Sequence, residues 1–415
     1  MTATVHIVGA GLAGLSAAVR LTASGRSVVL HEATTFAGGR CRSYHDASLG
    51  MTIDNGNHLI LSGNRAALEY LRRIGAEHRL AGPPAAEFSF VDLASGERWV
   101  LRFNDGRIPF WIFDPSRRVP GTRALDYAAM APLLLAPAGK TVGEVIACEG
   151  TVYRRLVEPL LLAALNIDPP QGSARLAGAV IRETLAMGGR ACRPLVARGG
   201  LGATLIEPAL AFLHERGAAV RMEHQLRSMR FGPERVEMLY FGGDNVALRA
   251  DDAVILAVPP YAAAPLIDQL AMPTEFRAIV NAHFRIDPPP ALPPMLGVLN
   301  ATVEWIFAFP GRLSVTISAG DRLIDTPREE LAKAIWDEVA RVSGLPAALP
   351  PWQIVRERRA TFAATPAQDA KRPGATTKWR NLVLAGDWTD TGLPATIEGA
   401  IRSGNRAADM IAKLS

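Results

Sequence analysis

Short apolar runs alternate with amphipathic stretches along the chain, as expected for parallel strands joined by helices. Residues 5–8 form an apolar run, a glycine-rich turn follows at 9–14, and the next ten residues, LSAAVRLTAS, have helical spacing. A second apolar run at 27–30 leads to Glu32. This pattern predicts the strand–turn–helix–strand unit that opens a doubly wound α/β domain.

Two later stretches have the same texture. Residues 195–260 run from RGGLGATL through a predicted helix to the apolar strands VRMEHQLRSMRF and AVILAVP. Residues 376–415 carry the strand and helix of NLVLAGDWTDTGLPATIEGAIRSGNRAADMIAKL. Together with residues 1–65, these stretches predict one discontinuous Rossmann-like domain of α/β class.

The segments between them read as an inserted α+β domain made of residues 66–194 and 261–375. The first segment is mainly helical, and RWVLRFNDGRIPFWIF predicts a hairpin that turns at residues 104–106. The second contains the apolar strands VEWIFAFP and LSVTISAG and the helix PREELAKAIWDEVARVSG. We expect this inserted domain to bind the substrate.

The glycine turn has the spacing of a dinucleotide site. Gly9 makes the tight turn, Gly11 lets the backbone approach a diphosphate, and Gly14 lets the helix pack closely on the strand. The N–H groups at the start of the helix favour phosphate there. Glu32, 18 residues after Gly14, is spaced to accept hydrogen bonds from a ribose.

Further motifs decide between the dinucleotides. Gly38-Gly39-Arg40 offers a flat loop and a fork of donors, and the segment from Ile53 to Asn57 and His58 ends a strand with polar groups suited to a ring system. The strand that ends at Ala385 runs into Gly386 and Asp387, and a helix is predicted to start near Pro394.

Asp387 is placed to accept hydrogen bonds from a polyol such as ribityl, and the helix dipole favours negative charge on a reduced flavin. A nicotinamide cofactor has no ribityl chain, so we expect FAD. The alternative for this segment is a capped helix that docks on the sheet without a ligand.

Composition narrows the class of partner. With 415 residues and 49% apolar residues, the chain is large enough for two domains. The net charge is +5, and because the arginines are spread along the chain we expect no nucleic-acid partner. The three cysteines have no CxxC spacing and the eight histidines form no HxxxH pair, which predicts a reducing compartment and no metal site. With no signal peptide and no long apolar span, a cytoplasmic location is expected.

The motifs GAGLAGL, GGR and LAGDWTDTGLPATIEGAIRSG together resemble the FAD-dependent amine oxidase and phytoene desaturase superfamily. That resemblance implies that Glu32 binds the adenosine ribose and that Arg40 lies near the diphosphate or flavin. It also implies that Leu226 meets adenine through its backbone, that Asp387 takes the ribityl or diphosphate region, and that Thr396 and Ile397 lie beside the isoalloxazine. Because the GDWTDTG region contains no cysteine, FAD is expected to be non-covalent.

The stretches DNGNHLILSGN, VEPLLLAALN, RERRATFAATP and GLPATIEGAIRSGN resemble one branch, the hydroxysqualene dehydroxylases. The resemblance implies reduction of hydroxysqualene to squalene in hopanoid or related triterpene biosynthesis, in which hydride from reduced flavin replaces an allylic hydroxyl. Two alternatives stay open: a carotenoid-type desaturase or other isoprenoid or amine oxidase, and a lipid escort without catalysis. A C30 substrate also predicts contact with the inner face of the membrane, or hand-over from an upstream squalene-pathway enzyme.

Such a reaction needs an acid near the leaving hydroxyl, and His58 is the candidate because it follows the strand end near the expected flavin edge. Alternatively, His58 hydrogen-bonds flavin or backbone without transferring a proton. The apolar segments 128–138 and 160–165 are candidates for a substrate channel or a membrane-docking segment, or are ordinary core. For a group of aromatic residues there are also two alternatives: they face a cationic intermediate, or they are ordinary core. This group is Trp99, Phe103, Phe110, Trp111 and Phe113.

Overall fold

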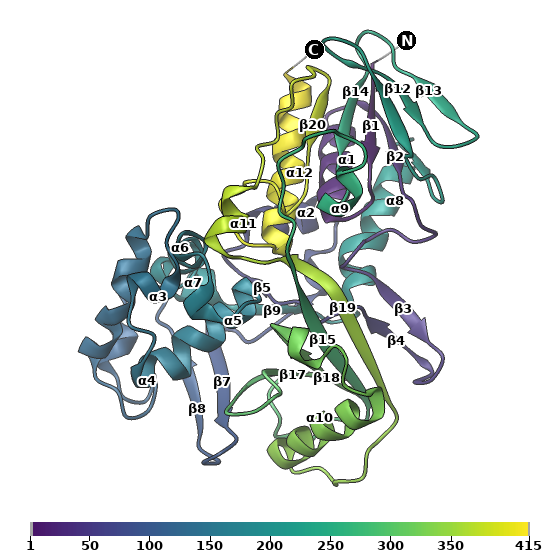
Figure 1. Ribbon diagram of the computed structural model, residues 1–415. Coiled ribbons are helices and arrows are strands. Elements are labelled where there is room, and N and C mark those ends of the chain that lie inside the picture. The colour runs from purple at the N-terminus through teal and green to yellow at the C-terminus, as the bar shows by residue number, and fades with distance from the viewer. Residues whose placement is uncertain (1–2, 414–415) are drawn as a thin grey trace.

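A five-stranded parallel sheet forms one end of the molecule in the computed structural model, which describes residues 3–413 (Figure 1). Its order is β10-β2-β1-β14-β20, and each neighbouring pair is parallel. The strands are β10 (Ala219–Arg221), β2 (Ser27–His31), β1 (Thr4–Val8), β14 (Ala253–Leu256) and β20 (Leu382–Leu384). Segments far apart in the sequence therefore meet in one Rossmann-like sheet, and the predicted α/β fold class is confirmed.

Helices α1 (Leu12–Ala23) and α12 (Ile397–Ala412) lie side by side against this sheet (Figure 1). Their close approach depends on Gly404, since a Cβ there would lie 2.0 Å from the carbonyl oxygen of Ala13. Helix α8 (Glu207–Glu215) also packs on α1. The first and last helices of the fold are thus locked together over the sheet.

The second large sheet of the molecule is mixed and has seven strands, in the order β19-β15-β18-β17-β16-β7-β8. All pairs are antiparallel except β16 with β7, which is parallel. Helix α10 (Arg328–Ser343) covers one face and buries Trp336 against the sheet. The strands are β7 (Glu87–Asp92), β8 (Arg98–Arg102), β15 (Phe276–Arg285), β16 (Met295–Leu299), β17 (Trp305–Phe309), β18 (Arg312–Ile317) and β19 (Trp352–Phe362).

A mainly helical part projects from the rest of the molecule (Figure 1). It contains η2 (Phe110–Phe113), η3 (Ala124–Leu135), α3 (Val142–Val145), α4 (Gly150–Val152), the π-helical η4 (Tyr153–Val157), α5 (Glu158–Leu165), η5 (Pro169–Gln171), α6 (Ala174–Glu183), η6 (Leu185–Met187) and α7 (Gly189–Cys192).

Smaller elements complete the described chain. The helical ones are α2 (Arg65–Arg73), η1 (Glu77–Arg79), η7 (Gly202–Ile206), α9 (Pro260–Ala263), η8 (Gly320–Leu323) and α11 (Pro366–Ala370). The strands are β3 (Ser43–Asp46) with β4 (Met51–Asp54), β5 (Ile60–Leu61) and β6 (Leu80–Ala81) with β9 (Pro194–Ala197), and β11 (Ser228–Phe231) and β13 (Asn245–Ala247) with β12 (Val236–Tyr240).

Two expectations about the segment after residue 65 differ from the structure. The hairpin pairs β7 with β8 and turns at residues 93–97, whereas residues 104–106 lie in the loop before η2. Helix α2 packs on α12 and α1 and buries Tyr70 and Leu71 in the apolar cluster of the nucleotide sheet, not in the inserted domain. Amphipathic spacing identifies the helix but not the surface that its apolar face covers.

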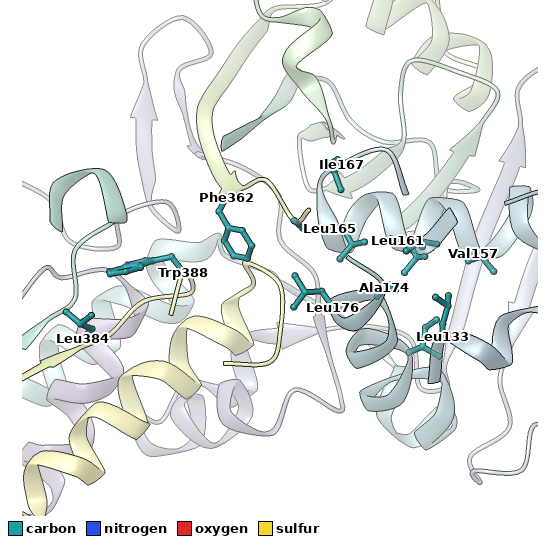
Figure 2. Packing of buried hydrophobic residues seen from close by; sticks show 14 of the residues in the cluster. Leu133, Val157, Leu161, Leu165, Ile167, Ala174, Leu176, Phe362, Leu384 and Trp388 are labelled. Carbon is teal, nitrogen blue, oxygen red and sulfur yellow. The ribbon is translucent and has the colours of Figure 1, made fainter. Parts of the chain in front are cut away.

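One apolar cluster connects the C-terminal motif with the helical part. Figure 2 shows Phe362 of β19 between Trp388 on one side and Leu165 and Leu176 on the other. The same cluster continues to Leu133 of η3. Packed apolar side chains therefore run continuously from the end of β20 into the helical insertion.

Candidate active site

The glycine turn after β1 forms a cradle with the Gly38–Gly39 loop. A Cβ at Gly9 would lie 2.6 Å from the carbonyl oxygen of Ala257, and one at Gly14 would lie 1.8 Å from that of Gly9. At Gly11, by contrast, a Cβ would meet no atom within 4 Å. Gly39 lies next to Gly11, and Gly38 bridges to it. Gly9 and Gly14 are thus needed for close packing, whereas Gly11 leaves an open backbone surface.

This open surface lies at the N-terminus of α1, where Gly11 is the N-cap without a side-chain bond. Among residues 3–413, the N–H groups of residues 12–14 have no acceptor. Unpaired helix N–H groups beside an open glycine backbone fit a diphosphate. The cradle therefore suits the group that the sequence predicts there.

Glu32 follows β2 directly and is fixed by its surroundings. Its Oε2 accepts a hydrogen bond from the backbone N–H of Ala10 at 2.9 Å, and its Oε1 accepts bonds from the N–H and hydroxyl of Thr34 at 2.9 and 3.0 Å. The carboxylate thus stands at the edge of the glycine cradle. Lone pairs that remain on its oxygens can accept from a ribose.

Leu226 lies between β10 and β11 with its side chain buried in the apolar cluster. Within the described chain, neither its backbone N–H nor its carbonyl takes part in a hydrogen bond. An unpaired donor and acceptor on one residue match the edge of an adenine base. The structure brings this backbone close to Glu32, since the N–H of His224 donates to the Glu32 carbonyl at 2.7 Å.

Three histidines, His6, His31 and His224, stack on one another near Glu32 and Leu226. Nδ1 of His6 lies 3.2 Å from Nε2 of His31, and Nδ1 of His31 lies 2.9 Å from Nδ1 of His224. Phe241 stacks on both His31 and His224. Burial lowers the pKa of His6 to about 4 and that of His31 to about 3, so both rings are neutral at pH 7. Sequence reasoning missed this stack because its members come from three different strands or loops.

Arg40 connects the first nucleotide motif to the last. Its guanidinium donates to the carboxylate of Asp387 at 2.7 Å and to the carbonyl oxygen of Ala360 at 2.5 Å. The Asp387 side chain is almost fully buried. Both predicted residues therefore lie in one place, and they hold each other in position.

The loop that carries Asp387 is organised by a residue that the sequence reasoning missed. Arg372 has a buried side chain that donates to the carbonyl oxygens of Asp387 and Thr389 at 3.1 and 2.5 Å and to Asp369 at 3.2 Å. Its guanidinium also stacks on Phe362. The N–H of Gly386 donates to the Ser403 hydroxyl at 2.9 Å, which fixes the loop to α12.

The helix predicted to start near Pro394 begins at Ile397, with Thr396 as its N-cap. The Thr396 hydroxyl accepts from the N–H of Gly399 at 3.0 Å, and Ile397 is buried. In the first turn, Glu398 accepts from the N–H groups at the start of α2. The first turn of α12 thus lies next to the start of α2, and the loop of Asp387 contacts the same helix at Ser403.

Asn57 carries the clearest unmet hydrogen-bonding group of the site. Its Nδ2 donates to the Thr316 hydroxyl at 3.0 Å, and that hydroxyl donates to Oδ1 of Asn281 at 2.8 Å. Oδ1 of Asn57 is buried, and no donor of residues 3–413 reaches it. Burying an acceptor without a partner is unfavourable, so this atom fits a donor from a bound ring system.

His58 lies beside Asn57, and both of its ring nitrogens are engaged. Nδ1 is 3.1 Å from the carbonyl oxygen of Gly56, which can only accept, so Nδ1 carries a proton. Nε2 is 3.8 Å from Sγ of Cys41. Burial alone lowers the pKa of His58, but Cys41, the Gly56 carbonyl and Asp54 outweigh burial and raise it to about 9.

Cys41 was not predicted as a site residue, although the sequence held a signal. Strands β3 and β4 form a hairpin between Cys41 and His58 and return the chain to its starting point, with the N–H of Asn55 donating to the Arg42 carbonyl at 2.9 Å. Strand-like alternation on both sides of residues 47–50 was available to predict this pairing.

The other candidate segments separate into core and surface. Trp99, Phe103 and Trp111 are buried, whereas Phe110 and Phe113 are exposed. In segment 160–165 Leu161 and Leu165 are buried and in segment 128–138 only Leu133 is, whereas the other residues of both segments are partly or fully exposed. The apolar sequence pattern was the same in both classes, so it did not distinguish them.

Comparison with known proteins agrees with these features. A family model described as flavin containing amine oxidoreductase matches residues 12–412. The chain is 61% identical over 412 residues to a hydroxysqualene dehydroxylase of Rhodopseudomonas palustris, covering 99% of each, and 60% identical to one of Sinorhizobium fredii, covering 99% of this chain and 98% of the relative.

Among solved structures, cyclohexylamine oxidase from Brevibacterium oxydans is similar with a TM-score of 0.73. The match covers 100% of this chain and 99% of that one at 19% identity. At that identity, the likeness concerns the fold.

Proposed function

Because the chain belongs to the flavin-containing amine oxidoreductases and, within them, to the hydroxysqualene dehydroxylases, we propose that it reduces hydroxysqualene to squalene with FAD. The observation that carries this proposal is the 61% identity over 99% of both chains. The distant resemblance to desaturases and amine oxidases concerns the fold and the cofactor class, not this substrate.

We assign the non-covalent FAD to the cradle and the loops around it. Gly9, Gly11 and Gly14 shape the diphosphate site at α1, with Gly39 beside it. The adenosine end is assigned to Glu32 and Leu226, and the ribityl and flavin end to Arg40, Asn57, Gly386, Asp387, Thr396 and Ile397.

FAD, when bound and reduced, supplies the hydride that replaces the allylic hydroxyl. The departing hydroxyl needs a proton to leave as water, and we assign this proton to Nε2 of His58. The 3.8 Å contact between Nε2 and Cys41 is long, so a substrate hydroxyl can replace the thiol as its partner. The Gly56 carbonyl holds Nδ1, which keeps the ring oriented while Nε2 gives up its proton.

We propose that the apolar cluster forms one wall of the dry environment that a C30 chain and a cation-like carbon require. It extends from Trp388 and Phe362 to Leu161 and Leu165 (Figure 2). Water excluded from this region cannot capture the allylic carbon in place of hydride.

We also propose that the substrate arrives from a membrane surface or by hand-over from the enzyme that makes it. A C30 hydrocarbon has a strong preference for an apolar phase. No helix within residues 3–413 is long and apolar enough to cross a membrane. Contact at the surface is therefore the form of association that we propose.

Anaerobic turnover tests the proposed reaction. Photoreduced holoenzyme is incubated with hydroxysqualene, and lipids are analysed by mass spectrometry while flavin absorbance is followed. We expect squalene to form in step with flavin oxidation. Absence of squalene with flavin still reduced contradicts the proposal. Desaturation of a carotenoid precursor by the oxidised enzyme supports the desaturase alternative, and a colourless protein unable to bind FAD supports the lipid escort.

A further inference from the structure

Large exposed apolar side chains concentrate on one part of the surface. Seven such side chains are exposed among the described residues, and five of them fall within residues 108–135: Ile108, Phe110, Phe113, Leu125 and Leu135. We call residues 107–113 and 124–138 the η2–η3 surface. A patch of this kind on a folded chain marks a binding surface, because water solvates it poorly.

The η3 part of this surface has an unusual composition. From Ala128 to Ala138 every side chain is apolar. Leu133 points into the core, whereas Leu135 is 89% exposed and Ala128, Ala131 and Pro132 are exposed as well. An amphipathic helix of a globular domain normally presents polar residues to water. This segment presents alanine, proline and leucine instead.

The exposed residues are carried by a firmly packed support. The buried Trp111 of η2 contacts the ring of Tyr127 of η3 edge-on, with centroids 5.1 Å apart, and the ring of Phe103 at 4.7 Å. The Tyr127 hydroxyl accepts from the N–H of Val119 at 2.9 Å. Both halves of the surface are therefore held in a fixed arrangement, and Phe110 and Phe113 belong to the same short helix as the buried Trp111.

Charge and an adjoining hollow indicate what covers this surface. Residues 105–126, which flank the apolar side chains, carry four arginines (107, 117, 118 and 123) against three aspartates (105, 114 and 126), and Asp126 is paired with Arg123 at 3.7 Å. A hollow of about 370 Å³ lies between η3 and α4, lined mainly by apolar residues such as Met130 and Tyr153, with Asp126, Glu149 and Thr151 also in its lining. Tyr153 belongs to the apolar cluster that reaches the site, so the hollow adjoins the dry interior.

We propose that the η2–η3 surface docks on an anionic lipid bilayer and positions the hollow behind η3 to take up lipid substrate. The lipid character of the substrate rests on the proposed function, whereas the docking itself follows from the exposed apolar residues and their arginine rim. Apolar side chains enter the acyl boundary while the arginines meet anionic headgroups.

Vesicle flotation of the FAD-loaded enzyme tests the docking. Wild type, the triple variant Phe113→Ser/Leu125→Ser/Leu135→Ser and the control Phe36→Ser are mixed with vesicles of phosphatidylcholine and phosphatidylglycerol, 3:1, or of phosphatidylcholine alone. Phe36 is a matched control, since it is 67% exposed against 66% for Phe113 and lies outside the surface. We expect the triple variant to bind at least about tenfold more weakly and Phe36→Ser to bind like wild type, with anionic vesicles preferred at low salt.

A second measurement does not depend on the triple variant. Leu135→Cys and Phe36→Cys, each in a Cys148→Ser background, are labelled with an environment-sensitive dye and added to the same vesicles. We expect a blue shift at position 135 and none at position 36. The docking is overturned if wild type fails to float, if the triple variant floats equally well, or if the dye at 135 does not respond. The docking is also overturned if wild type is a dimer and the triple variant a monomer, because the η2–η3 surface is then covered by a second copy of the chain.

Neither measurement uses hydroxysqualene, so docking can be established even if the proposed reaction fails. Conversely, the triple variant should retain wild-type turnover on hydroxysqualene in detergent micelles and lose at least about tenfold on vesicle-borne substrate. Equal turnover of the two enzymes on vesicles counts against uptake through this surface.

Discussion

The guanidinium of Arg40 lies 2.7 Å from the carboxylate of Asp387 and joins two motifs that are 347 positions apart in the chain. The pair closes the site between the glycine cradle and the loop before α12. Asp387 is nearly inaccessible to water, whereas part of Arg40 remains accessible. Loss of either partner is therefore expected to affect both the fold and the proposed cofactor site.

Removal of the carboxylate is expected to show both effects. Asp387→Ala leaves the Arg40 guanidinium without its partner and should lower the free energy of unfolding by roughly 2 kcal/mol, less than for a fully buried pair because Arg40 is partly exposed. The ratio of FAD to protein, measured by absorbance, should fall together with the melting temperature. Asp409→Ala is the control, since Asp409 pairs with Arg20 at 2.6 Å between α1 and α12 on the surface. Full FAD occupancy in Asp387→Ala contradicts the assignment.

The two glycines at 11 and 14 should respond differently to alanine. Gly11→Ala adds a methyl group in open space, so stability should stay within about 1 kcal/mol while FAD affinity falls at least about tenfold. Gly14→Ala forces a methyl group against the Gly9 carbonyl and should lower stability by about 3 kcal/mol or more. Chemical denaturation and FAD titration separate the two effects. A Gly11→Ala enzyme that binds FAD normally shows that the cradle does not hold the diphosphate.

Loss of the imidazole should affect turnover but not cofactor binding. His58→Ala is expected to keep FAD and to lower turnover by about 10²-fold, the scale of lost acid catalysis. Stopped-flow oxidation of reduced flavin by hydroxysqualene measures the step directly. Near-wild-type turnover with full flavin occupancy would dismiss His58 as the acid.

The pH profile provides an independent test of the contact between Cys41 and His58. The pKa of His58 is raised to about 9, so the ring stays protonated through neutral pH and activity should fall only above about pH 9. Stability from the protonated ring is fully present below pH 6.5 and is lost as pH rises through about 9. Cys41→Ala removes a cause of the raised pKa, so the alkaline limit of activity should move to lower pH. An unchanged limit argues against this coupling.

The histidine stack predicts a loss of stability in acid. Burial lowers the pKa of His6 to about 4, so between pH 6.5 and 4 the unfolded chain binds a proton that the folded chain does not. Folding stability should therefore decrease as pH falls through this window, by roughly 3 kcal/mol for His6 when complete. His6→Phe should flatten the acid limb of the melting curve against pH, whereas the exposed His45→Gln should not. Identical acid limbs in wild type and His6→Phe contradict this account.

The sequence predicted best those features that depend on short spacing. The first glycine turn, Glu32 and the strands around them lie within about thirty residues, so local pattern and turn chemistry defined them. The same holds for Asp387 and the helix capped by Thr396. In each case one supersecondary unit contains the whole signal.

What the sequence did not predict depends on contacts between distant segments. Asn57 is held by Thr316, 259 positions away, and the loop of Asp387 is held by Arg372, whose side chain is buried beneath it. No local periodicity encodes such partners. Likewise, the apolar pattern of α2 predicted a helix but not that this helix packs on α12. Amphipathicity identifies the face of a helix that is buried, and not the element that covers this face.

The position of β20 and α12 also has a consequence for how the protein is made. The glycine turn and Arg40 leave the ribosome more than 300 residues before the strand, the Asp387 loop and the helix that complete their surroundings. The proposed cofactor site therefore cannot be complete until β20, the Asp387 loop and α12 have been translated. A message interrupted by a stop codon before residue 382 would yield a chain with an intact glycine motif and no place to keep a flavin.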